Sequence, residues 1–512
     1  IVDEIMHLAR KLGGVISGEH GIGLTKMQYL DKSTIDAFSS YKHEVDPEQH
    51  FNRGKLLPGS GLHNAYTPSL RLLEQEALIL EASALGDLNN EVKDCLRCGK
   101  CKPVCTTHIP AANLLYSPRN KILASGLLVE AFLYEEQTRR GISTRHFDEL
   151  NDIADHCTIC HRCLSPCPVD IDFGEVSSLI KNILREKGKK RFNAGNWLAM
   201  SFLNVTNPRT IRLLRFAMIK VGYRAQRMVN RLARHFRLLP ENKRPTTTLG
   251  QPEVRSQIVN FVKKPLPADT PGPTLRALLD IEQSNIIPVI RDISKVTEES
   301  ESVFYFPGCG SERLFSQIGM ATLAMLYEQG VRTVLPPGYL CCGYPQTASG
   351  DARRGTQIST DNQVLMHRIA NTLSYLDIRT IIVSCGTCLD QLLKYQLQQI
   401  FPHCRTMDIH EFLLEKEVTL ESKGKKYLYH DPCHSPMKHH DPVNVASTLL
   451  GAEVMLSDRC CGESGTFAIS RPDIATQVRY RKQDELFSNI EALTGKAGKA
   501  DDLKILTSCP SC

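Results

Sequence analysis

The sequence reads CTICHRCLSPCP at residues 157–168. Residues 95–105 have the same cysteine spacing, C-x2-C-x2-C-x3-C, so one motif occurs twice. The chain has nineteen cysteines among 512 residues, and all but Cys404 fall into clusters with repeated spacing. Secreted disulfide domains are short and rich in loops, whereas close-set cysteines in a long chain indicate bound metal. We therefore expect metal sites and a reducing compartment.

Three cysteines separated by two residues can bind three corners of a 4Fe–4S cube from one loop, and the fourth binds the neighbouring cluster. The spacing therefore predicts two cubane clusters, with ligand sets Cys95, Cys98, Cys101 with Cys167, and Cys157, Cys160, Cys163 with Cys105. Structural zinc is the alternative, but zinc usually takes two separated CxxC pairs, which this duplicated motif fits poorly. The nearby His108, His156 and His161 are expected at the surface or packed around the ligands.

Residues 302–512 contain an internal repeat that reads strand, Cys, helix, CCG, strand and CxxC. Alternating apolar strands and helices predict a duplicated α/β fold, with its sites at the strand ends. Five cysteines recur at corresponding positions: Cys309, Cys341, Cys342, Cys385 and Cys388 in the first copy, and Cys433, Cys460, Cys461, Cys509 and Cys512 in the second.

The adjacent cysteines of this repeat have three explanations. A vicinal disulfide is disfavoured because neighbouring Cα atoms are only about 3.8 Å apart. A buried pair of inert thiols would not account for the CxxC. Thiolates in this number select iron–sulfur clusters or zinc, so the spacing indicates metal and leaves its type open. Cys404 lies outside the pattern and is expected to be a small apolar side chain, not a ligand.

The repeated pattern resembles the CCG domain of heterodisulfide reductase, of the iron–sulfur subunit of glycolate oxidase, and of the anchoring subunit of anaerobic glycerol-3-phosphate dehydrogenase. The dicluster motif belongs to the same architecture and extends the resemblance back to about residue 93. In heterodisulfide reductase, five-cysteine CCG sets bind noncubane 4Fe–4S clusters. Both copies keep all five positions here, so the resemblance implies up to two such clusters.

Residues 13–24, GGVISGEHGIGL, look like the end of an FAD-linked oxidase domain of the D-lactate, glycolate and D-2-hydroxyglutarate dehydrogenase type. Residues 52–55 match that family's closing Asn-Pro-Gly-Lys, with Arg53 in place of proline. An imidazole can take the hydroxyl proton while hydride leaves for the flavin. The resemblance implies that His20 is the catalytic or substrate-binding histidine and Glu19 a metal ligand in members that use a metal. The expected cofactor contacts are Gly18, Gly21 and Asn52. The alternative is a glycine-rich turn with an incidental histidine.

The chain is 42% hydrophobic and 23% charged, and it has no apolar stretch near the ~18 residues of a membrane span. It opens inside an apparent helix without a secretory signal, which predicts a fragment of a longer protein that would not bind FAD by itself. At roughly 150 residues per domain, the length predicts several domains. The expected layout is a truncated α+β flavin-oxidase remnant (1–60), a linker and helix (61–92), an α-helical dicluster ferredoxin-like module (93–190), a basic helical segment with a Pro-rich linker (191–301), and duplicated α/β CCG domains (302–415 and 425–512), the second truncated because it stops at a ligand.

Residues 181–240 hold fifteen Lys and Arg against one acidic residue, Glu186. Asn207 as N-cap and Pro208 as first residue predict an amphipathic helix over 208–239. Its basic stripe comprises Arg209, Arg212, Arg215, Lys220, Arg224, Arg227, Arg231 and Arg234, and its apolar stripe Leu214, Met218, Val221, Ala225, Val229, Leu232 and Phe236. Such a helix can dock on an anionic membrane. Alternatively, the apolar stripe packs on the CCG domains and the basic stripe is solvated or meets an acidic partner.

Together these features predict the iron–sulfur electron-transfer part of an oxidoreductase, a flavin-dependent dehydrogenase of a small D-2-hydroxy acid of the D-lactate or glycolate type. FAD would bind in the complete protein, and the electron acceptor would be a quinone or a redox protein. The alternatives are disulfide reduction at the CCG clusters, as in heterodisulfide reductase, and a non-catalytic carrier that docks on a membrane. No nucleic-acid partner is expected. The expected location is cytoplasmic, with peripheral contact at the cytoplasmic membrane face.

Overall fold

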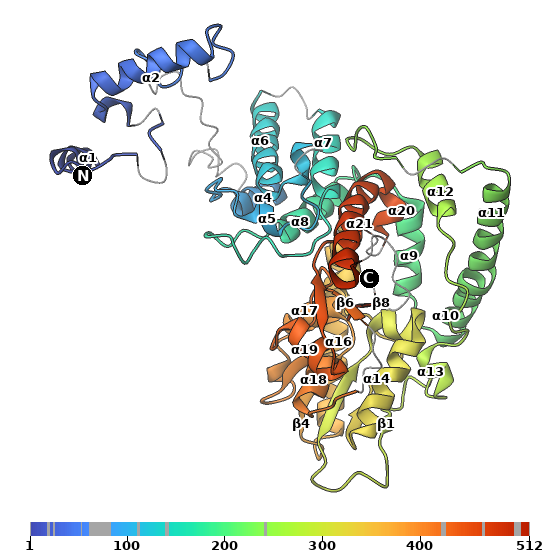
Figure 1. The fold of residues 1–512 in the computed structure, drawn as a ribbon. Helices are drawn as coiled ribbons and strands as arrows, with labels where there is room; N and C mark the ends of the chain where they lie inside the picture. Colours follow the sequence, from blue (N-terminus) through green and yellow to red (C-terminus); the bar gives the residue numbers. More distant parts are fainter. Residues whose placement is uncertain are drawn as a thin grey trace. The chain divides into compact units, whose positions relative to one another are not determined.

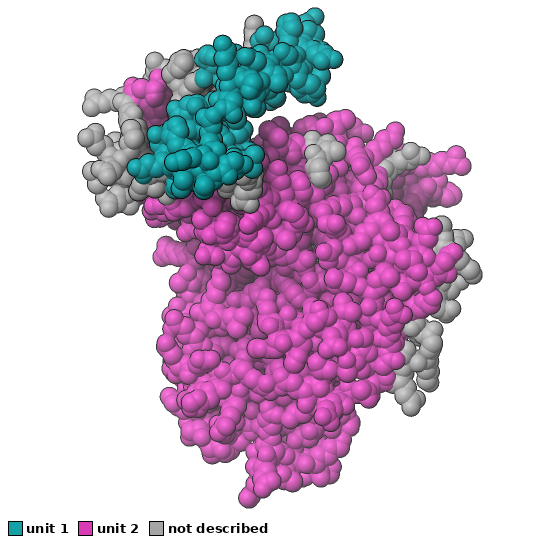
Figure 2. Space-filling view, turned by 60° about the vertical axis from the view of Figure 1, so that its left-hand side comes forward, with its two compact units in different colours: residues 1–69 teal, residues 70–512 magenta. Residues whose placement is uncertain are grey.

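The computed structural model describes residues 2–17, 21–23, 26–52, 54–60, 83–109, 113–138, 143–239, 243–420, 426–462, 466–495 and 503–510. The chain forms two compact units, residues 1–69 and residues 70–512, which Figure 2 colours separately.

The first unit has helix α1 (Val2–Lys11), a 3-10 turn (Met27–Tyr29) and helix α2 (Lys32–Val45). A hydrogen bond from the Tyr29 hydroxyl to Asp3 Oδ1 at 2.6 Å ties the turn to α1. Among the described residues of this unit, only Ile16, Tyr29 and Asp46 are buried. This unit therefore has very little core of its own.

The second unit begins with a helical module. Its elements are α4 (Ala84–Val92), α5 (Cys101–Val104), a 3-10 turn (Leu114–Tyr116), α6 (Pro118–Gln137), α7 (Thr144–Asp155) and α8 (Phe173–Glu186). Leu88, Phe132, Leu150 and Ile180, from four different helices, pack in one core. Asp172 begins α8 by accepting a hydrogen bond from the Gly174 N–H at 2.7 Å. These helices hold the cysteine loops between them.

The middle of the chain forms helices at one side of the unit (Figure 1). They are α9 (Ala194–Asn204), α10 (Pro208–Arg215), a π-helical segment (Phe216–Gly222), α11 (Tyr223–His235), α12 (Val254–Lys263) and α13 (Leu275–Leu278). The Asn207 side chain accepts from the N–H groups of Arg209 and Thr210, so the predicted N-cap is confirmed. The helical stretch ends at His235, earlier than predicted.

The helical stretch from Pro208 to His235 is buried along one stripe, which comprises Ile211, Arg215, Ile219, Gln226 and Asn230. The sequence assigned Arg215 to the basic stripe, but its side chain is buried and donates to the Gly272 carbonyl at 2.9 Å. The Gln226 and Asn230 amides donate to carbonyls of Phe261 and Val262 at 2.8 and 2.7 Å, near the end of α12, where such carbonyls lack helical partners. The alternative that the apolar stripe packs on the CCG domains is wrong, because Val221, Leu232 and Phe236 are exposed.

The first α/β domain has a five-stranded sheet in the order β1-β3-β2-β4-β5. Its strands are β1 (Val289–Ile290), β2 (Ser302–Phe306), β3 (Arg332–Val334), β4 (Ile378–Val383) and β5 (Arg405–Asp408). All neighbours are parallel except β1, which pairs antiparallel with β3. Its helices are α14 (Ser316–Glu328), α15 (Tyr344–Ala348), α16 (Ala352–Thr372), α17 (Gly386–Leu393) and α18 (Ile409–Glu415). The predicted α/β class is confirmed for this region.

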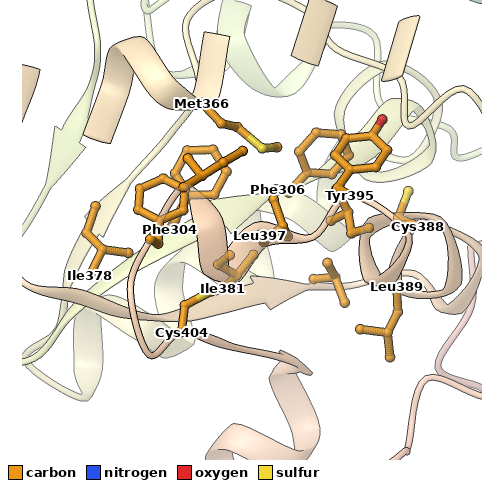
Figure 3. Packing of buried hydrophobic residues seen from close by; sticks show 14 of the residues in the cluster. Phe304, Phe306, Met366, Ile378, Ile381, Cys388, Leu389, Tyr395, Leu397 and Cys404 are labelled. Carbon is orange, nitrogen blue, oxygen red and sulfur yellow. The ribbon is translucent and has the colours of Figure 1, made fainter. Parts of the chain in front are cut away.

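Buried apolar residues fill the space between this sheet and its helices (Figure 3). Phe304, Phe306 and Ile381 come from the central strands. Cys404 is also buried here, directly before β5, which confirms that it packs as a small apolar side chain. Cys388 lies at the other end of the cluster in Figure 3, so Cys404 is remote from that cysteine.

The second α/β domain has a parallel three-stranded sheet in the order β7-β6-β8. Its elements are β6 (Lys426–His430), α19 (Pro442–Leu450), β7 (Val454–Ser457), α20 (Phe467–Ser470), α21 (Pro472–Thr494) and β8 (Leu503–Leu506). Its central strand is the one before the first cysteine, as in the first domain. A buried hydrogen bond is also repeated, since Tyr305 pairs with Ser384 at 2.8 Å and Tyr429 with Ser508 at 2.6 Å. The structure thus confirms the internal repeat.

Candidate metal centres

The cysteines of the repeat follow the carboxyl ends of the central parallel strands. Cys309 follows β2, Cys385 follows β4, Cys433 follows β6 and Cys509 follows β8. Parallel strands bring their carboxyl ends to one edge of a sheet, which is where α/β folds place their sites. The fold therefore gathers each predicted set at one edge.

In the first domain the thiols form a continuous series of contacts. Cys309 Sγ lies 3.9 Å from Cys341 Sγ. Cys341 contacts Cys342, which contacts Cys388, and Cys388 contacts Cys385. The structure thus brings together all five cysteines that the sequence assigns to this set.

The second domain gathers its cysteines only in part. Cys433 Sγ lies 3.6 Å from Cys460 Sγ, and Cys460 contacts Cys461. Cys509 packs instead in the core of the first domain, where its thiol contacts Cys385. Cys512 lies outside the described residues. The two sets therefore meet at Cys385 and Cys509, a contact that the repeat pattern does not predict.

Each CCG turn has a glycine for a steric reason. Gly343 has φ +87°, and a Cβ there would lie 2.8 Å from the Gly355 carbonyl oxygen of α16. Gly462 has φ +74°, and a Cβ there would lie 2.8 Å from the Ala475 carbonyl oxygen of α21. A side chain would need an unfavourable backbone conformation and would push the turn away from its helix. The glycine thus lets both adjacent cysteines reach the site.

The helical module places the first predicted cubane set around one small apolar cavity. Cys95, Cys98, Cys101 and Cys167 all line it, together with Cys163 of the second set and apolar neighbours such as Ile122. Cys167 is also a close electrostatic neighbour of Cys95. Cys167 therefore crosses from the second motif to the first, as the spacing predicts.

The cysteines of the second predicted cubane set also lie close to one another. Cys105 and Cys157 are close electrostatic neighbours of Cys160, and Cys157 and Cys160 are neighbours of Cys163. The Thr106 hydroxyl donates to Cys160 Sγ at 3.4 Å.

The two cysteine loops share an unusual backbone shape. Residues with left-handed φ occupy the same positions in both: Arg97, Gly99, Ile159 and His161. This shape turns backbone N–H groups toward the sulfurs, and the Ile159 N–H donates to Cys157 Sγ at 3.3 Å. Donors aimed in this way stabilise a negative charge on a bound cluster.

Burial keeps the thiols of Cys157, Cys160 and Cys163 protonated when no metal is bound. The pKa of Cys160 is raised to about 12 by burial and by the nearby Cys433 and Cys105 thiols. Burial also raises the pKa of Cys157 and Cys163. Because metal ligands must be thiolates, metal binding at these sites would release protons.

The second cubane set lies against the second CCG set. Arg162 pairs with Asp431, and its guanidinium also donates to the Pro432 carbonyl at 3.1 Å. From α21, Arg481 donates to the His108 carbonyl at 2.6 Å. These contacts place Cys433 among the closest charged neighbours of the Cys160 thiol.

A hydrogen-bonded series of side chains crosses the same junction. His161 lies between Cys160 and Cys163, pairs with Asp172 at 2.5 Å, and contacts the Tyr344 hydroxyl at 3.2 Å. Tyr344 follows the first CCG turn and contacts His434 at 3.0 Å. His434, next to Cys433, pairs with Asp390 at 2.6 Å. The series links three cysteine loops, and sequence analysis missed it because its members are far apart in the chain.

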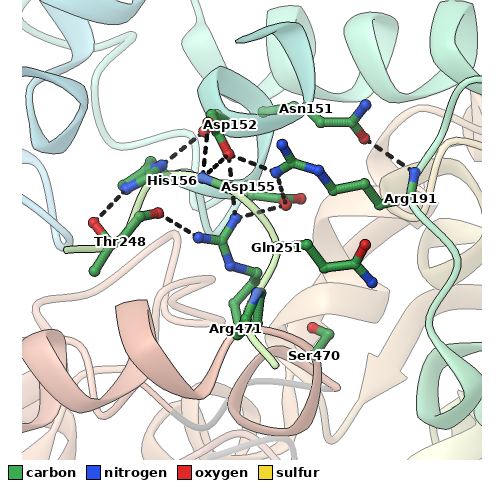
Figure 4. A network of polar contacts seen from close by, with 12 residues as sticks. Asn151, Asp152, Asp155, His156, Arg191, Thr248, Gln251, Ser470 and Arg471 are labelled. Atoms are coloured by element: carbon green, nitrogen blue, oxygen red, sulfur yellow. Dashed lines mark hydrogen bonds and ion pairs between the residues drawn. The ribbon is translucent and has the colours of Figure 1, made fainter. Parts of the chain in front are cut away.

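A cavity of about 260 Å³ opens beside this junction, lined in part by Cys157, Tyr344 and His434. Two arginines that line this cavity form ion pairs with aspartates (Figure 4). Arg191 contacts Asp152 at 2.5 Å, and Arg471 contacts Asp155 at 2.8 Å. Both aspartates come from α7, so these ion pairs join the helical module to the middle segment and to the second α/β domain.

The predicted flavin residues lie mostly beyond the described part of the first unit. Gly18, Glu19 and His20 fall outside the described residues. Gly21 has φ +69° and its carbonyl accepts from Lys26 Nζ at 3.1 Å. Asn52 lines a surface cavity of the first unit. Roles in catalysis or FAD binding remain predictions for all of them.

Comparison with family models assigns all three parts of the chain. Residues 1–56 match the model for the C-terminal domain of FAD linked oxidases, residues 80–171 match a 4Fe-4S dicluster domain, and residues 303–393 and 427–512 match a cysteine-rich domain. The chain thus combines a match to the C-terminal domain of FAD linked oxidases with a 4Fe-4S dicluster domain and a pair of cysteine-rich CCG domains. The resemblances stated from the sequence are therefore confirmed.

Curated relatives share this iron–sulfur architecture at low identity. The chain is 22% identical to the probable glycolate oxidase iron-sulfur subunit of Bacillus subtilis, over 82% of this chain and 87% of that protein. It is 23% identical to the glycolate oxidase iron-sulfur subunit of Escherichia coli, over 81% and 88%. It is 20% identical to one polypeptide of the dihydromethanophenazine:CoB–CoM heterodisulfide reductase of Methanosarcina barkeri, over 82% and 87%.

Other relatives are matched over less of their length. The chain spans 40% of one polypeptide of the fumarate reductase (CoM/CoB) of Methanothermobacter marburgensis, at 27% identity. No solved structure matches the chain significantly. Within the described residues, no helix is long and apolar enough to cross a membrane.

Proposed function

We propose that this chain is the electron-transfer part of a flavin-dependent dehydrogenase of a small D-2-hydroxy acid, of the D-lactate or glycolate type. The proximity of the Cys160 and Cys433 thiols, which influence each other electrostatically, supports this role most directly, because it joins the helical module to the CCG pair. When bound, 4Fe–4S clusters accept and donate electrons one at a time. The cysteines would hold two cubane and two CCG-type clusters, with FAD in the complete protein and a quinone or redox protein as acceptor.

The four cysteine sets are neighbours in space. Cys167 ties the first cubane set to the second motif, and Cys433 adjoins the second cubane set. Cys509 then adjoins Cys385 of the first CCG domain. This continuous order is what a relay requires, and it favours passage of electrons from the helical module toward the CCG pair.

The test uses the protein with a complete, FAD-loaded flavin domain, prepared without oxygen. D-lactate or glycolate should bleach the flavin and then the cluster absorbance. Arg162→Gln, which removes the contacts with Asp431 and Pro432, should slow cluster bleaching and leave flavin reduction unchanged. Arg145→Gln, at an exposed arginine of α7, is the matched control. Flavin reduction with clusters that stay oxidised would overturn the relay.

We also propose that residues 208–236 dock on the anionic cytoplasmic face of a membrane. Apolar side chains are exposed along this stretch and its neighbour α9, including Trp197, Phe216, Leu232 and Phe236. Exposed cations accompany them: Arg209, Arg212, Lys220, Arg224, Arg231 and Arg234. A helix that combines exposed apolar side chains with local positive charge binds favourably at the headgroup region of an anionic membrane.

A further inference from the structure

The 260 Å³ cavity beside the junction is formed where four parts of the second unit meet. Cys157 and Lys181 come from the helical module, Lys190 from the segment after α8, and Tyr344 and His434 from the two CCG domains. Thr387, between Cys385 and Cys388, also lines it. The cavity therefore touches the loops of three of the four cysteine sets.

Positive charge dominates the lining. Four cations, Lys181, Lys190, Arg191 and Arg471, face one lining carboxylate, Asp155. The arginines are already neutralised, since Arg191 pairs with Asp152 and Arg471 with both Asp155 and Asp473. The charges of the two lysines are thus the ones that no ion pair balances among the described residues.

Neither lysine has a carboxylate within ion-pair distance among the described residues. Lys190 Nζ donates to the Ser349 carbonyl, and no group in the described part of the chain accepts a hydrogen bond from Lys181 Nζ. The pKa of Lys190 is lowered to about 8 by burial and by the charge of Lys181. Two partly buried ammonium groups that line one cavity repel each other, and a bound anion would offset that repulsion.

The rest of the wall suits an organic molecule more than a simple ion. Met200, Phe192, Pro345 and Phe467 supply apolar surface, and Tyr344 and His434 supply hydrogen-bonding groups. A volume of about 260 Å³ holds roughly eight waters at about 30 Å³ each, which is enough for a small metabolite. Pockets of mostly apolar lining with a few convergent polar groups are typical ligand sites.

We propose that this cavity binds a small carboxylate-bearing organic anion, and that Lys181 and Lys190 hold its charge. The bound anion would face the Tyr344 hydroxyl and the His434 ring, beside the Cys157 loop. Its role as a partner of the electron relay rests on the proposed function, whereas its binding does not.

Calorimetry with malonate tests the site in the anaerobic, cluster-loaded protein. Malonate should bind saturably, and neutral malonamide should not. Lys181→Gln and Lys190→Gln should each weaken binding at least about tenfold, because each removes a hydrogen bond to a charged group. Lys187→Gln, at an exposed lysine of the same segment, removes the same charge and should bind as the parent does. Malonate should also shift the electron paramagnetic resonance spectrum of the reduced protein, since Cys157 lines the cavity.

Absence of saturable malonate binding in the parent protein would overturn the proposal. Equal weakening by Lys187→Gln would do the same, because it would reduce the effect to general surface charge. Inorganic phosphate that binds as tightly as malonate, with the same dependence on both lysines, would overturn the carboxylate class. Loss of cluster reduction by the hydroxy acid, with malonate binding intact, would refute the proposed function and leave the anion site standing.

Discussion

Alanine at the glycine of each CCG turn should damage that turn more than alanine at an unconstrained left-handed glycine. Gly343, Gly462 and Gly188 have φ of +87°, +74° and +63°. Left-handed backbone costs an L-residue roughly 1–2 kcal/mol, and this cost is common to all three substitutions. A Cβ at Gly188 would meet nothing within 4 Å, so Gly188→Ala should lose only that amount.

The CCG glycines face a further cost from the backbone of the packed helix. A Cβ at Gly343 or Gly462 would lie 2.8 Å from a carbonyl oxygen, which cannot turn aside as a flexible side chain can. Overpacking of this kind costs roughly 1–3 kcal/mol, so the total loss should be about 2–5 kcal/mol. The turn would shift to relieve the clash and carry its two cysteines with it.

Two measurements check this reasoning. Denaturant unfolding of the metal-free chains should rank Gly188→Ala above both CCG variants in stability. Iron analysis after anaerobic reconstitution should show each CCG variant about a quarter short of iron, since one of four predicted clusters is affected. If Gly343→Ala were no less stable than Gly188→Ala and kept its full iron content, the steric account of the CCG turn would be refuted.

Three further predictions follow from the cysteines and the exposed helix. Anaerobically prepared protein should hold about 16 iron atoms in four clusters. About half that iron content would show that the CCG sets hold no clusters, and zinc in place of iron would refute the relay. Cys404→Ser should keep the iron content and the cluster absorbance of the parent but lose roughly 1–3 kcal/mol of stability, because it puts a hydroxyl group in an apolar core. Loss of cluster absorbance would show instead that Cys404 is a ligand. At low salt the protein should float with anionic liposomes but not with neutral ones, and the double variant Arg224→Glu with Arg231→Glu should no longer float. The control Arg353→Glu with Arg368→Glu, at exposed positions of α16, should float as the parent does. If the parent failed to float with anionic vesicles, the membrane proposal would be refuted.

Much of the cysteine framework is predictable because its constraints are local. The crossover of Cys167 follows from the longer gap before it, and the strand ends before Cys309 and Cys433 follow from short apolar runs. The CCG glycines were visible as well, although their reason is a contact with a helix that only the structure shows.

The rest depends on packing between distant segments. Strand β1 comes from a stretch expected to be a linker, because a two-residue strand leaves no periodic signal. The buried stripe of Gln226 and Asn230 is polar, so it could not be recognised as a contact face by its hydrophobicity. The series from Asp172 through Tyr344 to Asp390 joins residues more than 200 positions apart and has no sequence signature.

The two copies of the repeat share the same central strands but pack against different parts of the chain. The two five-cysteine sets therefore have different neighbours. Tyr305–Ser384 and Tyr429–Ser508 show that both copies keep the same central architecture. The second domain has three strands rather than five, and its Tyr427 and Tyr429 share a core with Tyr305 of the first. Cys509 packs against Cys385 of the first domain, while Arg162 of the helical module pairs with Asp431 of the second. The second domain thus contacts both the helical module and the first CCG set, and the first CCG turn also reaches the second cubane loop directly through Tyr344 and His161.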